Sequence, residues 1–256
     1  MKDKNFRHDC LQGKKILVTG ANSGIGEFTS NFLFKHGAKI IKTSRKFDVK
    51  DHKNEILNEK VIYLEKDLNT KNAAYEIFKD IPDNWLPIDG IFHAAGKELI
   101  SPLSLIDDID IEIAVKTSLN NALLFGKAAT KKKYLNESAS IVFLSSIASK
   151  LATPGMSIYG SVKSSLNTAT KFLACELFKR NIRVNCILSG AIKTPMHERI
   201  ISKLTDSAKN DYEKKHLLGF GNPIDIANMI IFLMSDSSSW ITGTEIYVDG
   251  GFSCSK

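Results

Sequence analysis

Lys15-Ile-Leu-Val-Thr19 runs directly into Gly20-Ala-Asn-Ser-Gly-Ile-Gly26, and this stretch decides the fold. An apolar run of strand length meets a turn that contains three glycines, and a helix-length stretch, residues 27–35, follows. The glycines allow a tight turn and let backbone N–H groups approach a pyrophosphate, to which the helix N-terminus presents its partial positive charge. A glycine-rich turn placed after the first strand of a βαβ unit predicts a phosphate-binding loop.

Further along the chain, apolar runs of strand length alternate with amphipathic stretches of helix length. The remaining strand candidates are residues 39–43, 60–64, 88–92, 141–144, 182–188 and 245–248. Strands separated by helices form βαβ units, so the sequence predicts an α/β fold in which a seven-stranded parallel sheet carries helices on both faces. Because the chain has 256 residues and no linker or internal repeat, we expect one domain over residues 1–256.

Composition indicates an ordinary globular protein, with 43% hydrophobic and 25% charged residues. No apolar stretch approaches the roughly 18 residues that cross a bilayer, and Met1-Lys-Asp-Lys-Asn-Phe-Arg-His-Asp9 lacks the apolar centre of a signal peptide. We therefore expect a cytoplasmic protein without a membrane partner.

The net charge of +7 raises the question of a polyanionic partner. The lysines are spread along the chain, and the densest runs, Lys131-Lys-Lys133 and Lys214-Lys215, are not interleaved with aromatic residues. We therefore expect no nucleic-acid partner, although the charge would attract an anionic metabolite or a carrier protein. The four cysteines form no CxxC pair and the six histidines never fall at metal-ligand spacing, so no metal site is expected.

Ser157-Ile-Tyr-Gly-Ser-Val-Lys163 is the clearest chemical signal. Four-residue spacing on a helix puts Tyr159 and Lys163 on one face, and the ammonium charge is expected to lower the phenol pKa from its usual value of about 10. Ser146 ends the apolar run Ser140-Ile-Val-Phe-Leu-Ser-Ser146, which predicts a buried strand that delivers a hydroxyl to the sheet edge. Hydroxyl and phenol can together hold one carbonyl oxygen.

These motifs, in this order, resemble the short-chain dehydrogenase/reductase family, and in particular its 3-oxoacyl-acyl-carrier-protein reductases. The resemblance covers about residues 13–252 and rests on TGxxxGxG at 19–26, AAG at 94–96, the set Ser146, Tyr159 and Lys163, and Val248-Asp-Gly-Gly251. It implies a single Rossmann-type domain, a nicotinamide dinucleotide cofactor, and a homotetramer or homodimer built on helix packing. It also implies that Tyr159 is the general acid/base, that Lys163 binds the nicotinamide ribose, and that Ser146 orients the substrate carbonyl.

The chain departs from the family pattern at three places. Ser118 stands where the family has a catalytic asparagine, and we expect it to hold a water in the proton relay from Lys163; Asn120 or Asn121 is the alternative if the alignment shifts by a turn. His93 precedes the AAG segment, where it either lines the adenosine ribose or packs at a strand end. Ser189-Gly190 replaces the usual Pro-Gly, while Ile192 and Thr194 still match positions that contact the nicotinamide carboxamide.

The residues after the second strand predict the choice of cofactor. Ser44 occupies the position that is acidic in NAD-preferring relatives, while Arg45 and Lys46 offer cations to a 2'-phosphate, so NADP(H) is expected and NAD(H) is less favoured. Asp67 matches the position that hydrogen-bonds the adenine amine. The residues expected to contact the cofactor are Gly20, Asn22, Ser23, Gly24, Ile25, Gly26, Ser44, Arg45, Asp67, Leu68, Ala94, Ala95, Gly96, Tyr159, Lys163, Gly190, Ile192 and Thr194.

A charged segment at about 195–219 is expected to cover the active site as a lid that varies with substrate. The sequence thus predicts an NADP(H)-dependent oxidoreductase that reduces a ketone or oxidises a secondary alcohol, with a 3-oxoacyl thioester or a keto-sugar as candidate substrates. The alternative is a protein of the same fold that has lost catalysis and binds NADP(H) as a sensor or scaffold, which Ser118 weakly favours.

Overall fold

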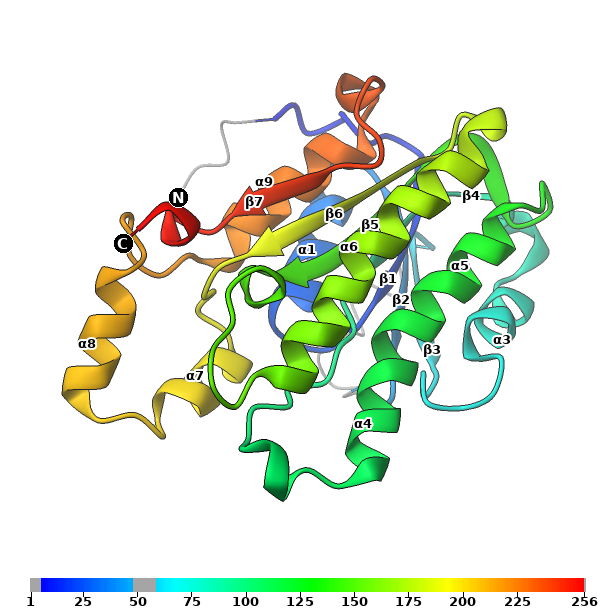
Figure 1. Cartoon of the computed structure of the whole chain (residues 1–256). Coiled ribbons are helices and arrows are strands. Elements are labelled where there is room, and N and C mark those ends of the chain that lie inside the picture. The colour runs from blue at the N-terminus through cyan, green and yellow to red at the C-terminus, as the bar shows by residue number, and fades with distance from the viewer. Residues whose placement is uncertain (1–5, 48–58, 256) are drawn as a thin grey trace.

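The centre of the molecule is a seven-stranded sheet, seen in a computed structural model that describes residues 6–47 and 59–255 (Figure 1). Every neighbouring pair of strands is parallel, and the strand order is β3-β2-β1-β4-β5-β6-β7. The strands are β1 Lys15–Thr19, β2 Lys39–Ser44, β3 Val61–Glu65, β4 Ile88–His93, β5 Leu135–Ser146, β6 Arg183–Ser189 and β7 Glu245–Val248. The predicted parallel α/β sheet is confirmed.

Strand β5 begins earlier than the apolar run 141–144 indicated. Leu135 already pairs with Ile88, and the register then shifts before Gly90 pairs with Ser140. Ser138 adopts a positive φ of 63° in this irregular stretch. Because Asn136, Glu137 and Ser138 are polar, the hydrophobic pattern does not indicate a strand there.

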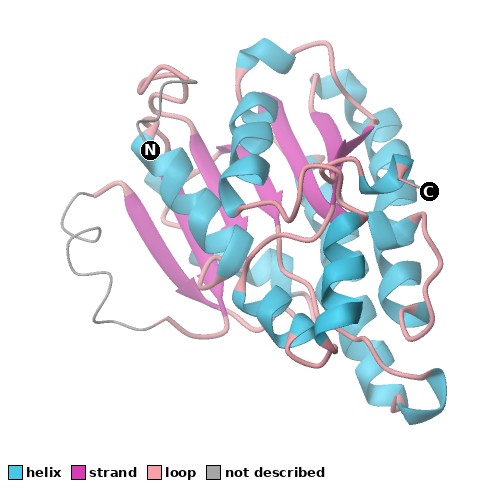
Figure 2. Ribbon diagram, turned by 90° about the vertical axis from the view of Figure 1, so that its left-hand side faces the viewer, coloured by secondary structure: helices cyan, strands magenta, loops and turns pink. Residues whose placement is uncertain are grey.

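Helices cover both faces of the sheet (Figure 1, Figure 2). On one face lie α1 Gly24–Lys35 and α9 Pro223–Met234. On the other lie α3 Ala73–Asp80, α5 Asn121–Ala129 and α6 Ser157–Leu177. Alternate strand residues feed two apolar cores: Leu17, Ile91 and Phe143 point to the α3–α5–α6 side, while Val18, Phe92 and Val142 point to the α1–α9 side. Such burial on both faces explains why the strands are apolar throughout.

Three further helices lie beyond the sheet at the lower side of Figure 1: α4 Asp108–Val115, α7 Pro195–Ile201 and α8 Asp206–Lys214. Between α4 and α5 the chain makes a π-helical turn, Lys116–Asn120. Among the described residues, no helix is both long and apolar enough to cross a membrane. Residues 1–5, on which the expected lack of a signal peptide partly depends, lie outside the described part of the chain.

Sheet topology determines where a ligand can bind. Strand β1 lies between β2 and β4, so the chain winds outward in opposite directions from the gap between β1 and β4. Crevices at such switch points, beyond the carboxyl ends of the strands, are the usual ligand sites of open α/β sheets. Thr19, His93 and Ser146 end β1, β4 and β5 and therefore share this edge.

Candidate active site

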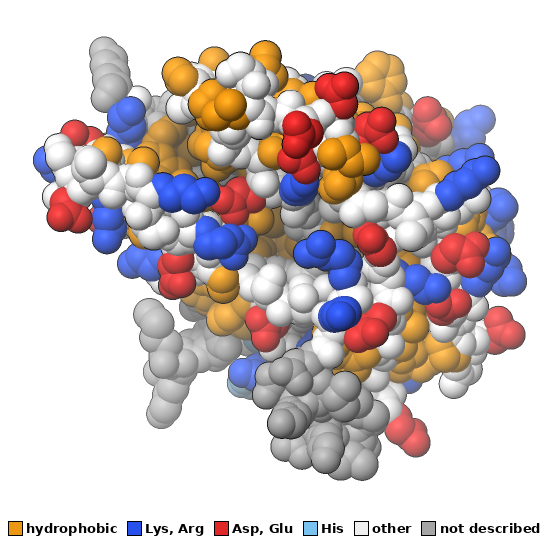
Figure 3. Space-filling view, turned by 90° about the horizontal axis from the view of Figure 1, so that it is seen from below, with side chains coloured by type: hydrophobic (Ala, Val, Ile, Leu, Met, Phe, Trp, Pro, Cys, Tyr) orange, Lys and Arg blue, Asp and Glu red, His pale blue; other side chains and the backbone are white. Residues whose placement is uncertain are grey.

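The predicted site residues converge at the carboxyl edge of the sheet. Figure 3 views the molecule from below, the side on which α4, α7 and α8 lie in Figure 1, and shows Lys and Arg side chains around a recessed centre with apolar patches. Within the described residues, no group of three or more His, Cys, Asp and Glu side chains is arranged to hold a metal ion.

Ser146 and Tyr159 face each other from two different elements. Ser146 is the last residue of β5, and its Oγ accepts a hydrogen bond from the Ala148 backbone N–H at 3.2 Å. Tyr159 lies in the first turn of α6, and the Ser146 side chain lies close enough to its hydroxyl to act on the phenol pKa. The two oxygen atoms therefore present a joint hydrogen-bonding site to a carbonyl oxygen.

Lys163 lies one turn further along α6 and is almost fully buried, at 5% exposure. Its ammonium donates a hydrogen bond to the Leu144 carbonyl at 2.7 Å, and its Nζ lies 5.7 Å from the centre of the Tyr159 ring. The spacing argument for one shared helix face therefore agrees with the structure.

The prediction that the Tyr159 pKa is lowered is wrong for the protein without a bound ligand. Burial of the phenol raises its pKa to about 12, although the side chain keeps some exposed surface, and the neighbouring Ser146 side chain opposes this rise only in part. Burial also lowers the pKa of Lys163 to about 8. Desolvation disfavours the charged form of each group and is the largest cause of both shifts.

Ser118 lies beside Lys163 because of the π-helical turn. A Cβ atom placed on Gly96 would lie 3.2 Å from Lys163 Nζ and 3.6 Å from Ser118 Oγ, so both groups border the same small space. Asn120 is exposed, and the Asn121 amide donates to the carbonyls of Leu68 and Lys116 at 2.8 and 2.6 Å. Of the three candidates for the family asparagine position, Ser118 is therefore the one whose side chain borders the same space as Lys163 Nζ.

His93 packs at the end of β4, with 1% of its surface exposed. Its Nδ1 lies 2.8 Å from Thr19 Oγ1 and its Nε2 lies 3.0 Å from the Ser118 carbonyl oxygen. The rings of Phe125 and Phe143 contact it edge to face. Of its two expected placements, packing at the strand end is the one observed.

The glycine loop fits a dinucleotide phosphate because its backbone leaves no room for side chains. A Cβ on Gly26 would lie only 2.3 Å from the Gly20 carbonyl oxygen, and one on Gly20 would lie 3.1 Å from the Ala95 backbone. Gly20 and Gly24 also have positive φ values of 67° and 57°. Ser23 is the N-cap of α1 and makes no side-chain capping bond, so this helix N-terminus and its backbone N–H groups remain available to an anion.

The adenosine side of the site lies at the ends of β2 and β3. Ser44 ends β2, and the exposed Arg45 and Lys46 follow it, with the Asn22 amide donating to the Lys46 carbonyl at 3.3 Å. The Asp67 carboxylate accepts two hydrogen bonds from Asn69, at 2.9 and 3.0 Å. A ligand amine at Asp67 would therefore share a carboxylate that is already engaged.

The opposite end of the crevice follows β6. Gly190 donates its N–H to the Val248 carbonyl at 3.0 Å, and Ile192 bridges to Gly221. Thr194 is the N-cap of α7, and its side chain lies 3.5 Å from the place of a Gly24 Cβ. The loop after β6 and the glycine loop thus meet across the switch point.

Two side chains that act on Tyr159 were not singled out by the sequence, and Arg199 of the charged segment 195–219 pairs with one of them. Glu98, in the loop after β4, and Tyr212, on α8, both raise the Tyr159 pKa through their charges. Arg199 on α7 pairs with Glu98 at 3.2 Å, and the Glu98 side chain is 17% exposed. These groups come from separate loops and helices, so no local motif marks them.

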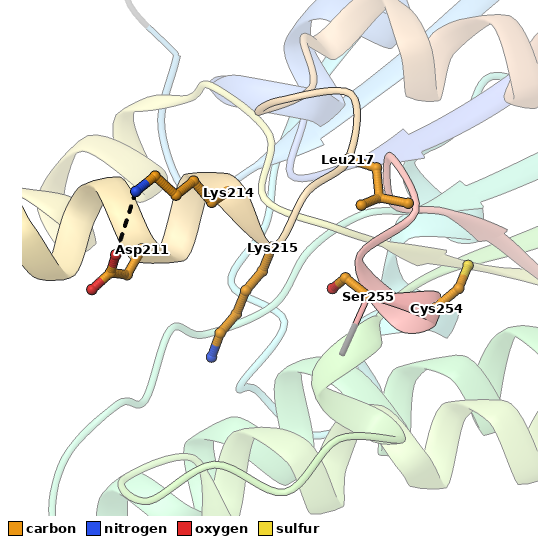
Figure 4. A pocket seen from close by; sticks show the side chains of 6 residues that line it. All are labelled: Asp211, Lys214, Lys215, Leu217, Cys254 and Ser255. Carbon is orange, nitrogen blue, oxygen red and sulfur yellow. Dashed lines mark ion pairs between the residues drawn. The ribbon is translucent and has the colours of Figure 1, made fainter.

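The segment with α7 and α8 is also attached to the protein at its far end. The His216 ring accepts a hydrogen bond from the Ala191 backbone N–H at 3.1 Å and packs on Phe220 and Phe252. A surface pocket lies outside this packing (Figure 4), and none of the predicted site residues lines it; its lining is Asp211, Lys214, Lys215, Leu217, Cys254 and Ser255.

Comparison with known proteins agrees with this geometry. A family model described as enoyl-(acyl carrier protein) reductase matches residues 20–253. The 3-oxoacyl-[acyl-carrier-protein] reductase FabG of Thermotoga maritima is 30% identical, over 94% of this chain and 98% of its own. Two solved structures are also similar. The structure of 4-hydroxyisoleucine dehydrogenase complexed with NADH has a TM-score of 0.85 at 26% identity and covers 95% of this chain and 100% of that one.

The second structure is a blue fluorescent protein from a metagenomic library in complex with NADPH. Its TM-score is 0.84 at 25% identity, and the match covers 94% of this chain and 98% of that one. The family model spans most of the chain, and the FabG relative matches it nearly end to end. The chain belongs to the short-chain dehydrogenase/reductase family of oxidoreductases.

Proposed function

We propose that this protein is an NADP(H)-dependent oxidoreductase that reduces a ketone to a secondary alcohol. The observation that carries the proposal is that the Ser146 and Tyr159 side chains lie together, with Lys163 one helical turn away and the glycine loop across the switch point. A sensor or scaffold that only binds the cofactor would not need the Ser146, Tyr159 and Lys163 side chains close together.

In the proposed reaction, a bound reduced nicotinamide would supply the hydride to the carbonyl. Ser146 donates a hydrogen bond that holds the substrate carbonyl oxygen beside the Tyr159 hydroxyl. Tyr159 then delivers its proton to that oxygen, which is the expected role of a phenol whose pKa lies above neutrality. Lys163, with Ser118 beside it, returns a proton to Tyr159 from solvent and holds the ribose hydroxyls of the cofactor.

Cofactor preference follows from the residues at the end of β2. Ser44 offers no carboxylate to accept the ribose hydroxyls, and the exposed guanidinium of Arg45 can bind a 2'-phosphate with charge-assisted hydrogen bonds. The similar structures include complexes with NADH and with NADPH. Arg45 is the reason to propose NADPH for this chain.

A 3-oxoacyl thioester is the substrate class we propose, because FabG of Thermotoga maritima is named for that activity. A keto-sugar is the second candidate. We further propose that the chain is one catalytic unit over residues 1–256, that residues 195–219 act as its substrate lid, and that it works as a homotetramer or homodimer in the cytoplasm. Glu98 and Arg199, which join the lid to the loop after β4, support the lid assignment.

The test is turnover of NADPH by Tyr159→Phe, with acetoacetyl-CoA as the first probe and a panel of keto-sugars as the second. Loss of the proton donor should lower kcat by about 10²- to 10⁴-fold while NADPH binding stays within about twofold. Tyr247→Phe, an exposed phenol on β7, is the matched control and should keep full activity. If the Tyr159 variant kept more than about a tenth of the rate, the phenol would not be the acid. NADPH binding without turnover of any probe would favour the sensor alternative.

A further inference from the structure

Both ring nitrogens of His93 are used in a hydrogen-bond chain whose direction is fixed. The Ser118 carbonyl, 3.0 Å from Nε2, can only accept, so Nε2 carries the hydrogen. Burial lowers the pKa of His93 to about 4, so its Nδ1 carries no hydrogen and accepts from the Thr19 hydroxyl at 2.8 Å. Thr19 Oγ1 in turn accepts from the Ala95 N–H at 3.1 Å. The series of hydrogen bonds therefore runs from Ala95 to Thr19, from Thr19 to His93 and from His93 to Ser118.

This series of hydrogen bonds connects the phosphate-binding edge of the sheet to the π-helical turn. Thr19 directly precedes the glycine loop, and Ser118 is the central residue of the turn Lys116–Asn120. The same Ser118 whose backbone carbonyl is held by His93 presents its hydroxyl to the space beside Gly96 that Lys163 also borders. A shift of the carbonyl would move the hydroxyl, because both belong to one buried residue.

We propose that His93 is a positioning residue for the proton relay: as a neutral imidazole it fixes the Ser118 carbonyl and so keeps Ser118 Oγ beside Lys163 Nζ. The inference rests on the proposed function, in which Ser118 and Lys163 carry protons toward solvent. Lys163 is the one charged side chain with a described electrostatic effect on the ring, and its charge also favours the neutral form. The Thr117 backbone acts in the opposite direction and raises the pKa, and the rings of Phe125 and Phe143 pack edge to face on the imidazole.

Two amide substitutions separate the two hydrogen bonds of His93. An asparagine places its amide at the depth of Nδ1, where it can accept from Thr19 but cannot reach the Ser118 carbonyl. A glutamine is one bond longer and places an N–H donor at the depth of Nε2. His93→Gln should therefore keep the contact with Ser118, and His93→Asn should lose it, at similar polarity.

The first measurements need no turnover. In ¹⁵N-histidine-labelled protein, the signals that vanish in His93→Gln should report a neutral Nε2–H tautomer that does not titrate between about pH 8 and pH 5.5. Hydrogen exchange of the amides in the turn Lys116–Asn120 should be faster in His93→Asn and close to wild type in His93→Gln. A ring that titrates near its ordinary pKa, or equal exchange in the two variants, would overturn the proposal even in a protein that reduces no ketone.

The kinetic test is a double-mutant cycle with Ser118→Ala, followed with NADPH and acetoacetyl-CoA. His93→Asn should lower kcat about 3- to 10-fold, as expected for one lost hydrogen bond, with KM and NADPH binding unchanged, and His93→Gln should restore most of the rate. In the Ser118→Ala background His93→Asn should cost nothing further, because the hydroxyl that it positions is gone. Additive losses would mean that His93 supports only the fold. Absence of turnover in the wild type would refute the proposed function and leave the exchange and tautomer results to decide this inference.

Discussion

Acidification should destabilise this fold through His93, by an amount that follows from its burial. Desolvation lowers the pKa of this histidine from 6.5 to about 4 in the folded state. Below pH 6.5 His93 is therefore protonated in the unfolded chain but stays neutral in the folded chain. The free energy of unfolding is thus highest above pH 6.5 and decreases as the pH falls toward 4. The two pKa values give a loss of about 2 kcal/mol in the free energy of unfolding between about pH 7.5 and pH 5.

Urea unfolding of the wild type and of His93→Gln across this pH range measures the effect. Glutamine does not titrate, while the other buried histidines, His36, His197 and His216, and all carboxylates are common to both proteins. The difference in unfolding free energy between the two proteins should then shrink by about 2 kcal/mol as the pH falls to 5. A difference that stays constant down to pH 5 would show that His93 is protonated in the fold, and the buried neutral imidazole would be refuted.

Three further predictions test the site. Ser118→Ala should slow turnover without weakening NADPH binding, whereas Ser118→Asn should be tolerated or modestly faster; an alanine variant at the wild-type rate would remove Ser118 from the relay. NADPH should bind about 10- to 100-fold more tightly than NADH, and calorimetry should find this order reversed in Ser44→Asp/Arg45→Ala; equal affinities in the wild type would exclude Arg45 as the determinant. Gly26→Ala, whose Cβ would lie 2.3 Å from the Gly20 carbonyl oxygen, should lower the free energy of unfolding by about 1–3 kcal/mol and weaken NADPH binding; an unchanged urea midpoint would contradict the close approach.

The fold could be predicted because its signals are local and repeat along the chain. Each strand is an apolar run bounded by turn residues, and the glycine loop follows the first of them, so topology rules leave few alternatives. The start of β5 could not be predicted in this way, because Asn136, Glu137 and Ser138 are polar and lie at a shift of register. Pairing there depends on the neighbouring strand and not on the residues themselves.

For the site, too, local features could be predicted and non-local contacts could not. The sequence singled out Ser146, Tyr159 and Lys163 because fixed spacings on one strand and one helix bring them together. Glu98 and Arg199 form their ion pair between segments about a hundred positions apart, and no spacing rule connects such residues. The hydrogen bond from His93 to Ser118 is equally non-local, and it depends on a π-helical turn that hydrophobic periodicity does not reveal.

The direction of the Tyr159 pKa shift could not be predicted from the sequence, and it determines which protonation state the phenol has. Spacing correctly predicted that Lys163 lies near the phenol, but the sign of the pKa shift depends on how many elements cover the pair, and burial prevails. Because the pKa of Tyr159 is about 12, the phenol holds its proton throughout the neutral range. The pKa of Lys163 is about 8. A protonated phenol is the form needed to donate to a carbonyl oxygen. At neutral pH Tyr159 is therefore in the form that can donate its proton, and its phenolate form increases only as the pH rises.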